Sequence, residues 1–259
     1  MNIQGRDCTL TVARDGVFYP LPYSEETVRE TSKGYSLPCV IGRRNRDKYI
    51  QTGRLIQGCF VSRLEYLNVY ALFLLLFNRD ESFDIYTDRG YEKEVYKNVN
   101  VKSFELRATN GEAFKFKANI CSNETSYVSS WPVNLFNLKW QKARTYYYNG
   151  HNVYADYQKL DLMYRFELNG NFDRNSEYII TLYFPLSQRQ HPQREVIEKL
   201  VIEIDNQDGI VLELNDLRPL DNLCDINCAD TVLFFQKFRV NGNIILSIRN
   251  QKENLQVIL

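Results

Sequence analysis

The stretch VKSFELRATNGEAFKFKA, residues 101–118, contains two alternating segments that meet across a polar turn. The segments around Phe104 and Phe114 each alternate apolar and charged residues, as a half-buried strand does. Asn110-Gly111 lies between them, and Asn-Gly strongly favours a hairpin because both residues accept the positive φ of a tight turn. The stretch therefore predicts a β-hairpin with one apolar face.

A second stretch, EKLVIEIDNQDGIVLELND at residues 198–216, repeats this pattern at a constant offset of 98 residues. Gly111 falls on Gly209, and the order of apolar and charged positions is kept while the identities change. The repeat indicates one structural unit used twice. A chain of 259 residues is long enough for two domains. We predict a mainly β fold with two tandem domains, residues 1–155 and 156–259.

The composition is that of an ordinary globular protein, with 44% hydrophobic and 25% charged residues. The 32 basic and 32 acidic side chains cancel, so no global field attracts the chain to nucleic acid or to an anionic membrane. The longest apolar run, Val69 to Phe77, is nine residues, whereas a bilayer span needs about 20. With no evident export signal, the six cysteines are expected to be free thiols in a reducing cytosol, and no membrane partner is expected.

A polar segment from Tyr23 to Lys48 separates the first short strands from the rest of the chain. It ends in a basic cluster made of Arg43, Arg44, Arg46 and Lys48. The segment is either an extended, solvated arm or loop, or a segment that becomes ordered against a neighbouring subunit, since connections of this length are often functional.

The clearest helix signal begins at Ser62. Ser62-Arg63-Leu64-Glu65 fits a capping box, and leucines follow at helical spacing as far as Leu75. We therefore predict a buried helix flanking the first domain over about residues 62–77. A buried strand from Val69 to Phe77 is the alternative interpretation.

Two further Asn-Gly pairs predict hairpins, one at Asn149-Gly150 and one at Asn241-Gly242. Each half of the chain would then contain a long hairpin followed by a hairpin with an Asn-Gly turn.

Motifs for catalysis and metal binding are missing from the sequence. His151 and His191 are the only histidines, Cys224 and Cys228 form one isolated pair, and no phosphate loop or nucleophile motif occurs. We expect no catalytic residues, no cofactor, no metal site and no enzyme activity, although a pair of carboxylates could meet in space from anywhere in the chain. The Arg43–Lys48 cluster could contact phosphates and Tyr146–Tyr148 could stack on bases; ordinary loop charge and sheet tyrosines are the other interpretation.

The order of elements over residues 7–121 resembles the tail tube proteins of tailed bacteriophages. That order comprises a short strand pair, the polar arm, Gly42-Arg43-Arg44, Gly53-x-Leu55-Ile56-x-Gly58-x-Phe60, the capped helix and the hairpin FELRATNGEAFKFKANI. The second half joins the resemblance only through the internal repeat, and it has no matching helix.

The resemblance implies that the two tandem domains are tail-tube-like β-sandwiches or β-barrels, the first with a flanking helix. It also implies a structural virion protein that is made in the host bacterial cytoplasm and self-assembles into stacked rings. The rings would form the phage tail tube, which conducts DNA during ejection without binding it specifically. Two tube-like domains in one chain imply trimeric rings with pseudo-sixfold symmetry, and a divergent second domain would instead imply hexameric rings. Other tail proteins are the remaining expected partners.

Charged residues of the two long hairpins are the candidates to face the lumen of such a tube. They are Glu105, Arg107, Lys115, Lys117, Glu203, Asp205 and Glu213, and the candidates for an arm that reaches the next ring are Arg43, Arg44, Arg46 and Lys48. Two alternatives stay open. One is a two-domain carbohydrate- or protein-binding module that uses Trp131 and Trp140, and the other is a distal tail or baseplate protein.

Overall fold

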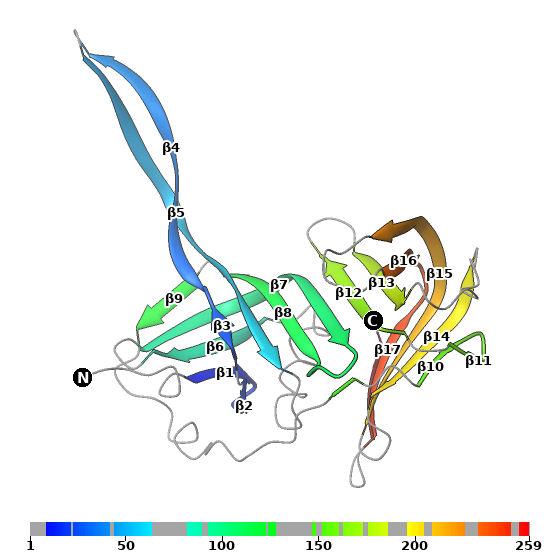
Figure 1. Cartoon of the computed structure of the whole chain (residues 1–259). Coiled ribbons are helices and arrows are strands. Elements are labelled where there is room, and N and C mark those ends of the chain that lie inside the picture. Colours follow the sequence, from blue (N-terminus) through cyan, green and yellow to red (C-terminus); the bar gives the residue numbers. More distant parts are fainter. Residues whose placement is uncertain are drawn as a thin grey trace.

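The structure is a computed structural model of the whole chain, and its described part consists almost entirely of β-strands (Figure 1). The described residues form eighteen strands and no helix, so the prediction of a mainly β fold is confirmed. The structure describes residues 9–21, 23–41, 44–63, 82–89, 93–122, 124–127, 147–148, 152–160, 163–172, 176–185, 196–204, 209–225, 233–249 and 254–258.

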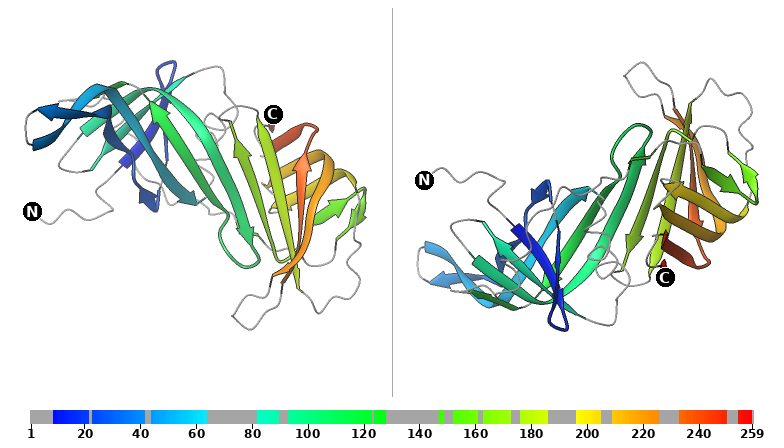
Figure 2. Two further views of the ribbon diagram at one scale, coloured as in Figure 1. Left: turned by 90° about the horizontal axis from the view of Figure 1, so that it is seen from above. Right: turned by 90° about the horizontal axis from the view of Figure 1, so that it is seen from below.

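Seven strands form one antiparallel sheet that crosses both halves of the chain. Their order is β5 (Arg44–Arg63), β8 (Lys115–Ser122), β7 (Lys93–Thr109), β12 (Arg165–Asn171), β13 (Glu177–Pro185), β16 (Leu233–Val240) and β15 (Ile210–Asp225). The pairing between β7 and β12 joins the two halves, with Leu106 opposite Leu168. Figure 2 shows these green and yellow-green strands side by side. The ranges predicted as separate domains therefore share a continuous sheet.

A smaller set of strands adds a second layer in each half. In the first half they are β1 (Thr9–Arg14), β2 (Val17–Pro20), β6 (Phe83–Asp88) and β9 (Glu124–Tyr127). In the second half they are β10 (Val153–Ala155), β11 (Gln158–Lys159), β14 (Ile197–Ile204), β17 (Ile244–Arg249) and β18 (Asn254–Ile258). The long strands β7 and β15 take part in both layers of their half, and each has an irregular register near the middle.

One cluster of buried side chains fills the space between the layers. Burial alternates along β7, β8, β12 and β13, because successive side chains of a strand point to opposite faces of its sheet. Phe104, Phe116 and Phe166 lie on the inner face of the seven-stranded sheet. The cluster is continuous from one half of the chain to the other, as the shared sheet requires.

Tyr148 carries a polar group into this core. Its Oη donates a hydrogen bond to the carbonyl oxygen of Met163 at 3.0 Å, and its ring packs edge-on against Phe166. Burial raises the pKa of the Tyr148 phenol above its ordinary value, since the charged form is poorly solvated there.

We expect Tyr148→Phe to destabilise the protein at neutral pH by about 1 kcal/mol, because the Met163 carbonyl loses its donor. Tyrosine in the unfolded chain ionises near pH 10, while folded Tyr148 stays protonated. The stabilisation is therefore complete below that pH and is lost as the pH rises above it. Urea unfolding of both proteins at pH 8 to 11 should show their stability difference shrinking, and a constant difference would contradict this assignment.

Both long hairpins form as predicted, β7 with β8 and β14 with β15. Gly111 has φ +80° in the first turn. The predicted equivalence of the two hairpins is wrong, because Leu106 pairs with Phe116 whereas Ile204, its counterpart in the repeat, pairs with Ile210. Nine residues separate Leu106 from Phe116 and five separate Ile204 from Ile210, so the register of the second hairpin is shifted by four residues. A shift by an even number keeps every side chain on its face, so the sequence pattern survives the change of register.

The outer neighbours of the hairpins also differ. On its other edge, the first strand of the first hairpin, β7, pairs with β12, whereas the first strand of the second hairpin, β14, pairs with β10.

The Asn241-Gly242 pair does not form a hairpin turn. Strands β16 and β17 each pair antiparallel with β15, at different parts of its length, so they run in the same direction and cannot form a hairpin with each other. The amide of Gly242 donates to the carbonyl oxygen of Asn215, and a Cβ on Gly242 would lie 2.7 Å from that oxygen. This glycine is required for close backbone approach. The Asn149-Gly150 pair lies outside the described residues, and the turn that joins β10 to β11 uses Asp156 and Tyr157, with φ of 49° and 65°.

Ser62 and Arg63 belong to strand β5, so the predicted helix start at Ser62 is wrong. Ser62 is buried and lies opposite Phe116 of β8. Its backbone is paired with a neighbouring strand of the sheet, a pairing that a helix N-cap residue does not make. The remainder of the predicted helix, and of the alternative strand at Val69–Phe77, lies outside the described residues.

Candidate assembly surfaces

A two-stranded ribbon extends from the body of the protein (Figure 1). It is built from β4 (Arg29–Ile41) and the first part of β5, which pair from Arg29 opposite Gln57 to Ile41 opposite Arg44. Thirteen residues of strand correspond to a length of about 40 Å. Within the described part of the chain, β4 pairs only with β5. The predicted polar arm is thus a β-ribbon over most of its length.

The basic cluster falls at the tip of this ribbon. Arg44, Arg46 and Lys48 lie on β5 opposite Ile41, Cys39 and Leu37 of β4. Arg43 lies outside the described residues. The structure therefore brings three of the four arm candidates together at the end farthest from the sheet.

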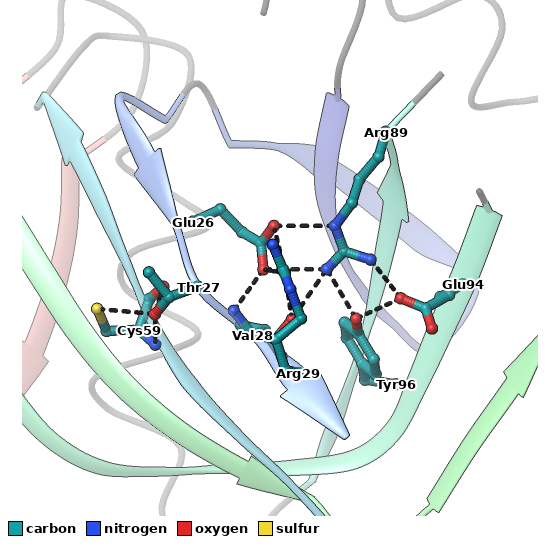
Figure 3. Close-up of polar contacts among 8 residues, drawn as sticks. All are labelled: Glu26, Thr27, Val28, Arg29, Cys59, Arg89, Glu94 and Tyr96. Atoms are coloured by element: carbon teal, nitrogen blue, oxygen red, sulfur yellow. Dashed lines mark hydrogen bonds and ion pairs between the residues drawn. The ribbon is translucent and has the colours of Figure 1, made fainter. Parts of the chain in front are cut away.

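A buried ion cluster fixes the base of the ribbon to the body (Figure 3). Arg89, which follows β6, contacts both carboxylate oxygens of Glu26 at 3.1 Å, and Glu26 lies in β3 (Glu25–Glu26) just before the ribbon. The same guanidinium donates to the carbonyl oxygen of Val28 at 3.0 Å. On its other side it contacts Glu94 and the Tyr96 hydroxyl of β7.

The cluster is nearly closed to solvent, since the side chains of Arg89, Glu26 and Glu94 are 7%, 6% and 10% exposed. Burial by itself would lower the pKa of Arg89, but hydrogen bonds to Glu26, Tyr96 and Glu94 outweigh it and raise that pKa. Burial, and then the hydrogen bond to Glu94, raise the pKa of Tyr96. One arginine thus holds two carboxylates that belong to different layers.

The outer side of the seven-stranded sheet, which we call the polar face, carries four of the predicted lumen residues. Glu105 of β7 lies opposite Lys117 of β8, and Arg107 lies opposite Lys115. All four have solvent-accessible side chains. A shallow groove of about 260 Å³ opens on this face beside Glu105 and Lys117.

The other predicted lumen residues lie elsewhere. Glu203 and Glu213 belong to β14 and β15 where these strands form the second layer, and Glu213 contacts Lys199 at 2.6 Å. Asp205 lies outside the described residues. The structure therefore separates Glu203 and Glu213 from the four residues of the polar face.

Sequence reasoning missed the residues that meet the first hairpin on the polar face. Glu167 of β12 lies opposite Arg107, with 3.7 Å between its carboxylate and the Arg107 Nε. Glu167 also contacts Arg165 and accepts a hydrogen bond from the Tyr183 hydroxyl at 3.1 Å, while Arg165 stacks on the Tyr183 ring. The alternation in residues 165–171 signals a strand, but nothing in the sequence identifies β7 as its partner.

Several other candidates lie outside the described residues, namely Trp131, Trp140, His151, His191 and Cys228. Among the residues that are described, no three metal-binding side chains cluster. No helix in this part of the chain is long and apolar enough to cross a membrane.

The sequence matches no protein-family model and no curated protein.

Proposed function

We propose that the chain is a structural subunit of a phage tail tube, which assembles with copies of itself into stacked rings around a channel for DNA. The observation that carries the proposal is the sheet that continues from β5 to β15 through both halves. A sheet of this width offers a wall with one apolar side and one polar side. Curved around an axis and closed by other copies, such walls leave no unpaired sheet edges.

The ribbon supports the stacking part of the proposal. The ribbon is about 40 Å long and extends away from the body, so it could contact a subunit of a neighbouring ring. Its base is held by Arg89, which fixes its direction before assembly. The polar face, with Glu105, Arg107, Lys115 and Lys117, would then face the channel.

Negative-stain electron microscopy of the purified full-length protein tests the proposal. At high concentration we expect rings and short tubes. Protein that stays monomeric at every concentration, and is absent from the tail of its source particle, would refute it. Copy number in the particle separates a tube subunit from a distal tail or baseplate protein, because a tube repeats its subunit many times.

Shortening the ribbon separates ring formation from stacking. Residues 34–52 can be replaced by Asn-Gly, which closes the ribbon beyond Lys33 and Gly53 and leaves Arg29 opposite Gln57. We expect a folded protein that still forms rings but stacks them at least tenfold less often, measured as tube length in micrographs. Tubes of unchanged length would show that the ribbon does not connect rings.

A further inference from the structure

The shallow groove on the polar face lies over two adjacent rows of side chains that cross β8, β7, β12 and β13. Residues directly opposite one another in a sheet point to the same side, so both rows border one space. Four strands at about 4.8 Å spacing make this space about 14 Å wide. The first row is Asn119, Ser103, Asn171 and Glu177, and the second is Lys117, Glu105, Asn169 and Ile179.

The charged side chains of the lining have partners of opposite charge. Glu105 lies opposite Lys117. The Glu177 carboxylate contacts Arg239 at 2.8 Å, and Arg239 lies opposite Ile179. No three metal-binding side chains cluster among the residues that the structure describes. The groove therefore favours an uncharged ligand over a phosphate, a carboxylate or a metal ion.

Much of the lining can still donate or accept hydrogen bonds. Asn119 donates to the Ser103 hydroxyl oxygen at 2.7 Å, which leaves the Asn119 carbonyl oxygen to accept and the Ser103 proton to donate. The side chains of Asn169 and Lys117 make no hydrogen bond or ion pair within the described part of the chain. These closely spaced donors and acceptors match the neighbouring hydroxyl groups of a ligand, because each hydroxyl both donates and accepts.

Other uncharged ligands match the groove less well. A peptide strand binds at an open sheet edge, whereas the four strands under the groove have partners on both sides. A nucleobase stacks on an accessible aromatic ring, and the one aromatic residue among the described residues of the lining, Phe104, is 3% exposed. Ile179 offers an apolar contact of the size of one side chain. A ligand with many hydroxyl groups and a small apolar surface fits this combination.

We propose that the groove binds one ring of a neutral sugar, with Glu105, Asn169 and Lys117 as hydrogen-bonding residues and Ile179 against the C–H groups of the ring. Its volume of about 260 Å³ lies below the range of about 300 to 1,000 Å³ that is usual for drug-sized ligands, which limits the ligand to a single ring. A free sugar and the terminal ring of a glycan present the same hydroxyl groups.

The site belongs to a single chain, so the inference does not depend on the assembly of a tube. It also does not involve Trp131 or Trp140.

Saturation-transfer NMR tests the inference with the methyl glycosides of glucose, galactose, mannose and N-acetylglucosamine, each titrated against the full-length protein. These probes are small enough to reach the groove in free and in assembled protein. We expect saturable binding of at least one of them with a Kd of about 1 to 10 mM, the affinity range of so small a ligand.

The test variant combines Glu105→Ala with Asn169→Ala. The control combines Glu198→Ala on β14 with Asn243→Ala directly before β17, both exposed and away from the groove, and removes the same two kinds of side chain. We expect the test variant to bind the glycoside at least tenfold more weakly and the control to keep the Kd of the parent protein.

Three results would overturn the inference: no saturable binding of any of the four glycosides, equal binding by the test variant and the control, or binding of glucuronic acid with no binding of a neutral glycoside. A glycan array distinguishes the two sources of the ring. Array binding that the test variant loses and the control keeps indicates a glycan, and NMR binding alone indicates a free sugar.

Circular dichroism spectra check that both variants are folded. Electron microscopy of the same samples shows whether rings form, so a failure of sugar binding is distinguishable from a failure of assembly.

Discussion

Replacing Arg89 with methionine should lower the free energy of unfolding by about 3 to 5 kcal/mol. The substitution leaves the carboxylates of Glu26 and Glu94 buried without their cation, and an uncompensated buried charge is strongly destabilising. The Val28 carbonyl oxygen loses a donor as well. Urea unfolding monitored by circular dichroism measures the change.

Arg239→Met is the matched control, since it removes an arginine from an ion pair with Glu177 whose two side chains are 51% and 41% exposed. Exposed pairs contribute less than about 1 kcal/mol, so this variant should remain close to the parent protein. The double variant Arg89→Met with Glu94→Gln should be more stable than Arg89→Met alone, because only one of the two buried carboxylates, that of Glu26, is then left without a cation. Equal effects of Arg89→Met and Arg239→Met would show that the cluster does not stabilise the fold.

Gly170→Ala should destabilise the protein by about 1 to 3 kcal/mol, the usual cost of adding a methyl group to a packed core. A Cβ at Gly170 of β12 would lie 2.1 Å from the ring of Phe104 on β7. That ring packs against the rings of Phe172 and Tyr178, which also contact each other, so these neighbours oppose its displacement. The strain would fall on the junction between the two halves.

Combining Gly170→Ala with Phe104→Leu tests the origin of this effect. The smaller side chain relieves the clash, so the two changes should be non-additive by more than about 0.5 kcal/mol. Gly111→Ala is the control, because Gly111 lies in a turn where an added Cβ would have no atom within 4 Å. Its effect should add to that of Phe104→Leu. Additive behaviour of the Gly170 pair would contradict the packing assignment.

The strands of this fold are largely predictable from the sequence, because alternation records which face of a strand is buried. The two long hairpins follow from such patterns in residues 101–118 and 198–216. The difference in register between the two hairpins cannot be predicted from the alternation, because a shift of four residues leaves the pattern of inward and outward residues unchanged. Local periodicity determines the face of a strand but not its partner.

The predictions that were wrong, and the ion cluster that was not predicted, have the same physical cause: partners that lie far away in the sequence. Asn241-Gly242 has the composition of a turn, yet its glycine serves the close approach of the backbone to Asn215. Ser62 fits a helix cap, yet the sheet gives it a partner on β8. The cluster around Arg89 joins residues up to 63 positions apart in sequence, and single charged residues in polar segments carry no signal of such a meeting.

The pairing of β7 with β12 also constrains how this chain could have evolved. Dividing the gene near residue 155 would leave each product with an open strand edge, β7 in one and β12 in the other, and each edge is a template for aggregation. Insertions between the halves keep the two strands paired, whereas separation does not. The junction therefore favours inheritance of the two halves as a single gene, even if they began as copies of one.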